Sequence, residues 1–277
     1  IPYLLLLLDE ADAFIESCEE VDYHPFDALK DLQGIGIDRF KFVIAGLRNI
    51  IRFNREKALG NNSVLTQLAS MTVKPFQVNE ARELLEIPLY YLGLRFQEDK
   101  ESLISLIFAS ANYFPGLIQL YCAKLLEAMR KGDYAGYSES DTPPYEVQES
   151  HIKKVLADKG FMEQIQEKFD ITLRLDDDNY YHIIALLISN LYHEKGDTGG
   201  YTPREVQEEG EIYEISKIEE LSLDKLTALM EELCELNVLR KTSDQKYLFN
   251  QYRFHQMMGS HKEVDDKLMK YMEESNG

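Results

Sequence analysis

Two adjacent carboxylates, Asp9 and Glu10, come directly after an apolar run over residues 3–8. A buried parallel strand ends in this way when it delivers acidic side chains to the carboxyl edge of an α/β sheet, where ligands bind. Carboxylate oxygens bind Mg²⁺, and a second carboxylate can orient or activate a water that attacks a phosphate. The pair therefore predicts the acidic half of a magnesium–triphosphate site. The alternative is a strand that ends in solvated acids.

A second group of polar side chains follows the next apolar run, residues 41–46, where Arg48 and Asn49 stand directly after a glycine. The carboxyl ends of parallel strands meet at one edge of a sheet, so these side chains would lie beside Asp9 and Glu10. A guanidinium at that place can grip a γ-phosphate and neutralise the charge that develops during phosphoryl transfer. The alternative for Arg48 is an ion pair with a surface carboxylate.

A third candidate is the pair Pro115 and Gly116, which opens a predicted helix. A glycine at a helix start lets the backbone approach a flat ligand such as adenine. The alternative is an ordinary helix start with proline in the first turn.

The loop that would grip the phosphates is missing from the sequence, because no Gly-x-x-x-x-Gly-Lys-Ser/Thr motif occurs in the 277 residues. The chain also opens with Ile-Pro rather than Met and enters an apolar strand almost at once. We therefore expect it to be the carboxyl-terminal part of a longer protein. We also expect that this part alone neither binds nor hydrolyses ATP.

The elements predicted to position these groups change in type along the chain. Apolar runs bounded by turn residues predict strands over 3–8, 41–46 and 71–76, with a helix over 26–33. Amphipathic patterns then predict helices over 80–92, with Asn79 as the N-cap, and over 99–111 and 115–130. Residues 132–148 have the composition of a linker, and 151–169 predict a connecting helix.

The last hundred residues predict another unit. Thr202 before Pro203 and Ser222 before Leu223 are N-cap signals for two helices that follow a helix over 180–194. Two short strands, 238–241 and 247–249, flank a Thr-Ser-Asp turn, and one or two helices occupy 252–275. Three helices and a hairpin make a winged helix-turn-helix.

Together these motifs resemble the carboxyl-terminal part of an AAA+ or STAND-type ATPase, a P-loop NTPase. Residues 4–12 look like Walker B, 42–48 like the sensor 1 strand and 80–130 like the helical lid. The resemblance implies the cofactors ATP and Mg²⁺. Asp9 would hold Mg²⁺ through water, Glu10 would activate the attacking water and Arg48 would sense the γ-phosphate. Asn49, Pro115 and Gly116 would contact the nucleotide.

The expected fold class is an incomplete α/β parallel sheet of P-loop type, followed by an α-helical lid and a C-terminal winged helix-turn-helix domain. The expected domains are a partial nucleotide-binding core over 1–78, the lid over 79–135, a linker with a connecting helix over 136–175, and the winged-helix domain over 176–277. The resemblance implies a nucleotide-dependent conformational change coupled to a winged-helix interaction domain. The alternatives are a DNA-binding initiator or regulator with an Orc-like domain order, and a non-catalytic protein-interaction module.

Composition limits the partners. With 30 Lys and Arg against 49 Asp and Glu, the net charge of −19 argues against a nucleic-acid surface over the whole molecule. The predicted recognition helix and the helix before it are mostly acidic, which disfavours DNA and favours a protein partner or the protein's own oligomer. The apolar run is too short to span a bilayer. Three scattered cysteines are typical of reduced thiols in a cytoplasmic protein, and their spacing suggests no metal site.

Overall fold

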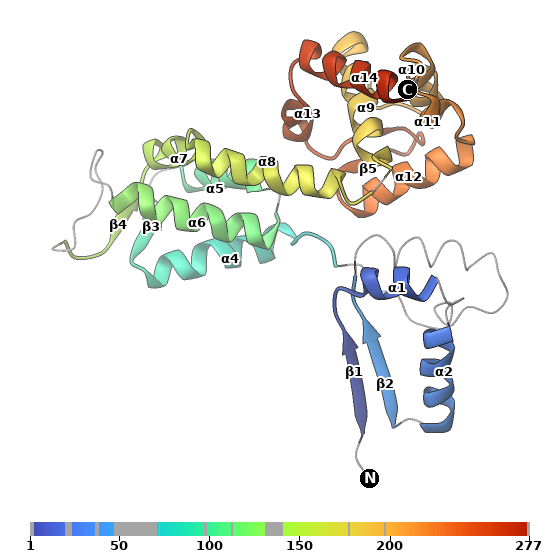
Figure 1. Ribbon diagram of the computed structural model, residues 1–277. Helices are drawn as coiled ribbons and strands as arrows, with labels where there is room; N and C mark the ends of the chain where they lie inside the picture. Colours follow the sequence, from blue (N-terminus) through green and yellow to red (C-terminus); the bar gives the residue numbers. More distant parts are fainter. Residues whose placement is uncertain are drawn as a thin grey trace.

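The computed structural model describes residues 3–19, 24–36, 39–46, 71, 73–96, 99–111, 113–130, 141–176, 178–196 and 198–275. This described part is mostly helical and contains two small parallel sheets and one small antiparallel sheet. Figure 1 shows a strand–helix unit at the N-terminus, then a layer of helices, then a second helical unit at the C-terminus. Within these residues, no helix has both the length and the apolar character needed to cross a membrane.

The N-terminal unit is built on two parallel strands. β1 (Leu4–Leu8) pairs with β2 (Phe40–Ile44) along its whole length. α1 (Ala11–Glu19) and α2 (His24–Gly36) connect them, and these helices form a small core with the strands. The predicted parallel pair is therefore confirmed.

The other face of this pair is open. Side chains alternate between the two faces of a strand, and Leu5, Leu7 and Val43 point away from the helices. They are 58%, 66% and 54% exposed. Parallel sheets are normally covered on both faces, so this unit is a sheet with one layer of helices among the described residues.

The third predicted strand, 71–76, is wrong for its described residues, 71 and 73–76, which form no strand. Val73 is 88% exposed. Instead, the Phe76 N–H donates to the carbonyl oxygen of Tyr113 at 3.1 Å, which ties the segment to the helical layer. An apolar run forms a strand only where a neighbouring strand can pair with it, and here the backbone finds another partner.

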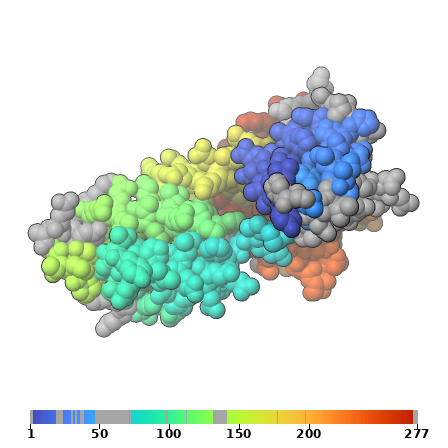
Figure 2. Space-filling view, turned by 90° about the horizontal axis from the view of Figure 1, so that it is seen from below, coloured from blue at the N-terminus to red at the C-terminus, as the bar shows by residue number. Residues whose placement is uncertain are grey.

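The helical layer follows. Its elements are α4 (Val78–Tyr91), β3 (Leu94–Phe96), α5 (Lys100–Ala111), α6 (Pro115–Arg130), β4 (Tyr145–Val147), α7 (Glu149–Leu156) and α8 (Lys159–Leu173). One hydrophobic core joins them, from Ala81 in α4 to Ile165 in α8. Figure 2 shows this layer, in cyan to yellow, as an elongated body. The described part of 136–175, expected to be a linker with a connecting helix, thus contributes to the same core as the expected lid.

Several local predictions in this layer need correction. The single helix expected over 151–169 is two helices, because Asp158 begins α8 by accepting the Phe161 N–H at 2.7 Å. α4 starts earlier than predicted, with Gln77 rather than Asn79 at its N-cap. The parallel pair of β3 and β4 was not predicted, and β4 lies inside the expected linker.

The C-terminal unit surrounds one buried helix. Its elements are α9 (Tyr180–Lys195), α10 (Pro203–Ile212), α11 (Ser216–Glu219), α12 (Leu223–Glu235), β5 (Leu239–Lys241), β6 (Tyr247–Phe249), α13 (Tyr252–Met258) and α14 (His261–Ser275). α9 is buried continuously from Ile183 to Leu191, and α10, α12, α13 and α14 pack against it. A helix that is apolar on all sides is stable only when it is enclosed in this way.

The local signals in this unit are confirmed. Thr202 accepts the Glu205 N–H at 3.2 Å, and Ser222 accepts the Lys225 N–H at 3.3 Å, so both predicted caps form. The antiparallel hairpin of β5 and β6 also forms. The structure adds an antiparallel bridge from Tyr201 to β6, and the short helix α11, neither of which was predicted.

Candidate functional site

The two N-terminal acids lie at the carboxyl edge of the parallel pair. The Ala45 N–H donates to the carbonyl oxygen of Leu8 at 2.7 Å, and the Ala11 N–H donates to the carbonyl oxygen of Ala45 at 2.9 Å. The turn that carries Asp9 and Glu10 is therefore fastened to the end of β2. Both acids are exposed, so the edge is accessible from solvent.

The backbone of this turn is constrained. Glu10 has a φ of +50°, in the left-handed region that few non-glycine residues adopt, and the Asp9 carboxylate accepts the Glu10 N–H at 2.9 Å. α1 begins at the next residue, Ala11, which is buried. The left-handed residue lets the chain pass directly from strand to helix, and it leaves the second oxygen of Asp9 without a hydrogen bond to a described residue.

Two of the predicted site residues, Arg48 and Asn49, lie outside the described residues. The described chain after β2 ends with Ala45 and Gly46, both exposed. The other half of the predicted edge therefore stays a prediction.

Pro115 and Gly116 occupy the first turn of α6, as predicted. Pro115 is half-buried and Gly116 is exposed. The loop before them is joined to the segment that follows the N-terminal unit through the hydrogen bond between Phe76 and Tyr113. No hydrogen bond between described residues connects Pro115 or Gly116 with Asp9 or Glu10, and the ordinary role of proline at a helix start explains Pro115.

The donors at this edge suit a hard cation only in part. Two carboxylates fit Mg²⁺, which usually takes one or two protein carboxylates and completes its shell with water and substrate phosphates. Within the described ranges, no group of three or more His, Cys, Asp or Glu side chains is placed to hold a metal ion.

The C-terminal unit contains two buried acids that sequence reasoning placed on the surface. Glu209 is 3% exposed and accepts a hydrogen bond from the Asn190 amide at 2.7 Å. Glu232 is 5% exposed and accepts one from the Tyr181 hydroxyl at 2.5 Å. Burial raises the pKa of Glu209. These two acids therefore add no exposed negative charge to α10 and α12, and the prediction that the acids of these helices form a phosphate-repelling surface is wrong for them.

Two histidines are also enclosed in this unit. His255 is 4% exposed, and its Nδ1 lies 2.9 Å from the Ser189 hydroxyl. Burial, and then the neighbouring His193, lower its pKa to about 4. His182, whose Nδ1 lies 2.8 Å from the Tyr271 hydroxyl, has a pKa lowered to about 4, chiefly by burial. Both rings are therefore neutral at physiological pH.

These histidines make stability depend on pH. Their pKa is about 4 in the folded protein, against an ordinary value of 6.5. Between these values the unfolded chain binds more protons, so the free energy of unfolding should fall as the pH drops from 6.5 towards 4. Denaturant titrations across this range should show a smaller fall for His255→Gln than for the wild type. The exposed His24→Gln serves as the control and should match the wild type. Equal slopes for the two variants would contradict the prediction.

Comparison with known proteins assigns no family. No family model matches this chain, and no curated protein sequence matches it significantly. The function must therefore be inferred from the residues and their geometry.

Proposed function

We propose that the chain supplies the acidic half of a magnesium–ATP site in a switch protein of AAA+/STAND type. The observation that supports this most is the position of Asp9 and Glu10 at the carboxyl edge of a parallel strand pair, on a turn fastened to β2. Asp9 would hold Mg²⁺ through water, and Glu10 would orient the attacking water. Because no phosphate loop occurs in these residues, another segment or chain would grip the phosphates.

We further propose that the C-terminal unit is a winged helix that contacts protein rather than DNA. The first part is supported by the order of the elements: α9, the Tyr201 segment that bridges to β6, α10, α12 and then the hairpin of β5 and β6. The second part is supported by charge. Lys241 of the hairpin pairs with Glu231 of α12 at 3.0 Å, so one of the few cations of the hairpin is already neutralised. The exposed charges of α12 are Asp224, Lys225 and Glu235, which are acidic on balance.

The switch would be transmitted through α8. Phe169 of α8 stacks on Phe254 of α13, with ring centroids 4.8 Å apart, and the Gln166 amide donates to the carbonyl oxygen of Met257 at 3.4 Å. A nucleotide-driven movement of the helical layer would thus reach the winged helix through a packed contact. Such coupling requires that the nucleotide favours one of two arrangements of this contact.

The proposal is tested by titrating ATP and Mg²⁺ into the protein isolated from its own cells. Asp9→Asn should weaken magnesium-dependent ATP binding about 10–100-fold, since the group that orders a metal's bound water is lost. Asp27→Asn, an exposed acid on α2, is the matched control and should bind as the wild type does. The 277-residue chain alone should give no binding heat. Unchanged affinity in Asp9→Asn would favour a non-catalytic interaction module.

A further inference from the structure

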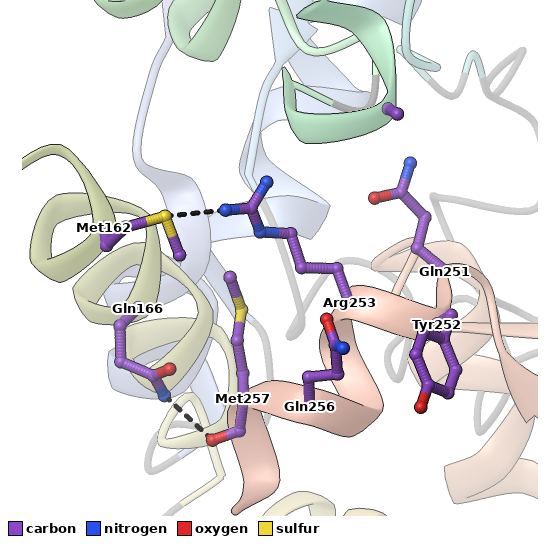
Figure 3. Close-up of a pocket in the computed structure, with 8 residues that line it drawn as sticks. Met162, Gln166, Gln251, Tyr252, Arg253, Gln256 and Met257 are labelled. Atoms are coloured by element: carbon purple, nitrogen blue, oxygen red, sulfur yellow. Dashed lines mark hydrogen bonds between the residues drawn. The ribbon is translucent and has the colours of Figure 1, made fainter. Parts of the chain in front are cut away.

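An open pocket of about 590 Å³ lies between α8 and α13, with Ala109 of α5 at its rim. Its volume falls in the range of about 300–1,000 Å³ that is usual for small-molecule sites. Met162 and Met257 supply apolar walls from the two helices, and Arg253, Gln251 and Gln256 supply polar groups (Figure 3). None of the lining residues belongs to the N-terminal unit, so this pocket is separate from the proposed nucleotide edge.

Arg253 is the unusual member of the pocket. Its guanidinium is half-buried, and its Nη2 lies 2.6 Å from the sulfur of Met162. It forms no ion pair with any described carboxylate, although the chain has 49 acids. By contrast, Arg82 is held by Glu86 and Glu101, at 3.0 Å and 2.7 Å.

The guanidinium lacks acceptors of matching strength. It carries five N–H donors, whereas a thioether sulfur is only a weak acceptor. Burial lowers the pKa of Arg253, and the contribution that opposes this shift comes from Tyr121 rather than from a carboxylate, yet an arginine stays cationic at neutral pH. A partly buried cation without an anion is costly, and an oxyanion entering the pocket would remove that cost.

The neighbouring groups extend the site beyond a single charge. The side-chain amides of Gln251 and Gln256 also line the pocket and form no hydrogen bond with any described residue; Figure 3 shows Gln251 to the right of Arg253 and Gln256 below it. Methionine side chains adapt their shape to different apolar ligands. The pocket thus offers a guanidinium that can bind an oxyanion, two further amides among its lining residues and a flexible apolar wall.

We propose that this pocket binds a small organic anion, with its carboxylate or phosphate on Arg253 and its apolar body against Met162 and Met257. The anion would lie between α8 and α13 and stabilise the docking of the C-terminal unit on the helical layer. Binding of this anion would not depend on nucleotide at the N-terminal edge.

Methyl NMR of the full chain, labelled at the methionine methyl groups, tests the site directly. Phenyl phosphate and benzoate are the two probes, and benzyl alcohol is the uncharged comparison. We expect saturable shifts of the Met162 and Met257 methyl signals with at least one anion and none with the alcohol. Shifts with only one anion identify whether the natural ligand carries a phosphate or a carboxylate.

Two arginine variants distinguish binding in this pocket from nonspecific attraction of an anion to surface charge. Arg253→Gln keeps a polar side chain but loses the charge, and should weaken binding about tenfold or more. Arg204→Gln, an exposed arginine paired with Glu208, should bind as the wild type does. If Arg253→Gln fails to fold, Arg253→Lys replaces it and should bind several-fold more weakly, because lysine lacks the fork. Absence of shifts with both anions, or equal affinity in the Arg253 and Arg204 variants, would overturn the proposal.

Discussion

Replacement of Leu186 by alanine should lower the free energy of unfolding of the C-terminal unit by about 2–5 kcal/mol. Leu186 has no exposed surface and lies in the middle of α9, the helix around which α10, α12, α13 and α14 pack. The shortened side chain would leave a cavity that rigid neighbours on every side cannot fill. Urea denaturation followed by far-ultraviolet circular dichroism measures the loss.

The control for this variant is Ile212→Ala, at the end of α10. Ile212 is 74% exposed, so its truncation should change the free energy of unfolding by no more than about 0.5 kcal/mol. Similar losses in the two variants would show that α9 does not organise this unit. A large loss for Leu186 alone would show that the buried face of α9 holds the unit together.

The elements that sequence reasoning located well depend on signals close together in the chain. Thr202 and Pro203 define the start of α10, and Ser222 defines the start of α12, because a capping side chain bonds an amide only three residues away. The same holds for the hairpin of β5 and β6, whose strands are joined by a short turn.

The elements that were missed or wrong depend on partners far away in the chain. β3 pairs with β4 across roughly fifty residues, and each strand is too short to show a periodic pattern. The segment 71–76 has the composition of a strand, but its described residues form none, and the Phe76 N–H bonds to Tyr113 instead. Propensity describes how a segment suits a sheet and says nothing of whether a neighbouring strand is available.

The same reason explains the buried acids. Glu209 and Glu232 occupy helices whose other charged side chains are at least partly exposed, so the sequence predicted that they were exposed as well. Their partners, Asn190 and Tyr181, both lie in α9, 19 and 51 residues away. The only local signal was the neighbouring apolar residues Val206 and Leu233, which belong to the core. A buried carboxylate needs a specific donor, and that donor becomes visible only once the helices are packed.

At the candidate site, the sequence was sufficient to predict where the acidic turn lies, but not which residues face that turn. An apolar strand that ends in two acids fixes their place at a sheet edge, and β1 and β2 do pair in parallel there. Pro115 and Gly116 depend on how the helical layer lies against that edge, which no local pattern encodes. Arg253 was not selected, because a single cation among aromatic residues is ordinary in sequence. What distinguishes it in the fold is that no carboxylate of the described residues forms an ion pair with it.

Glu10→Gln is expected to reduce ATP turnover by about 10²–10⁴-fold in the protein as the cell makes it, while ATP binding is retained. Glutamine keeps the shape of the side chain and the left-handed turn but cannot accept the proton of the attacking water. Phosphate release, measured beside an ATP titration, separates the two effects. Glu16→Gln, an exposed acid on α1, is the control and should keep full turnover.

The two acids should then differ in what they affect. Asp9→Asn should act on magnesium-dependent binding, and Glu10→Gln on the chemical step, because a metal's bound water and an attacking water need different carboxylates. Full turnover in Glu10→Gln would remove this residue from the chemistry. Loss of binding and turnover together in Glu10→Gln, with an altered circular dichroism spectrum, would instead show that the left-handed turn holds β1 and α1 in place. The matched pair thus distinguishes a magnesium–nucleotide edge from a strand that simply ends in solvated acids.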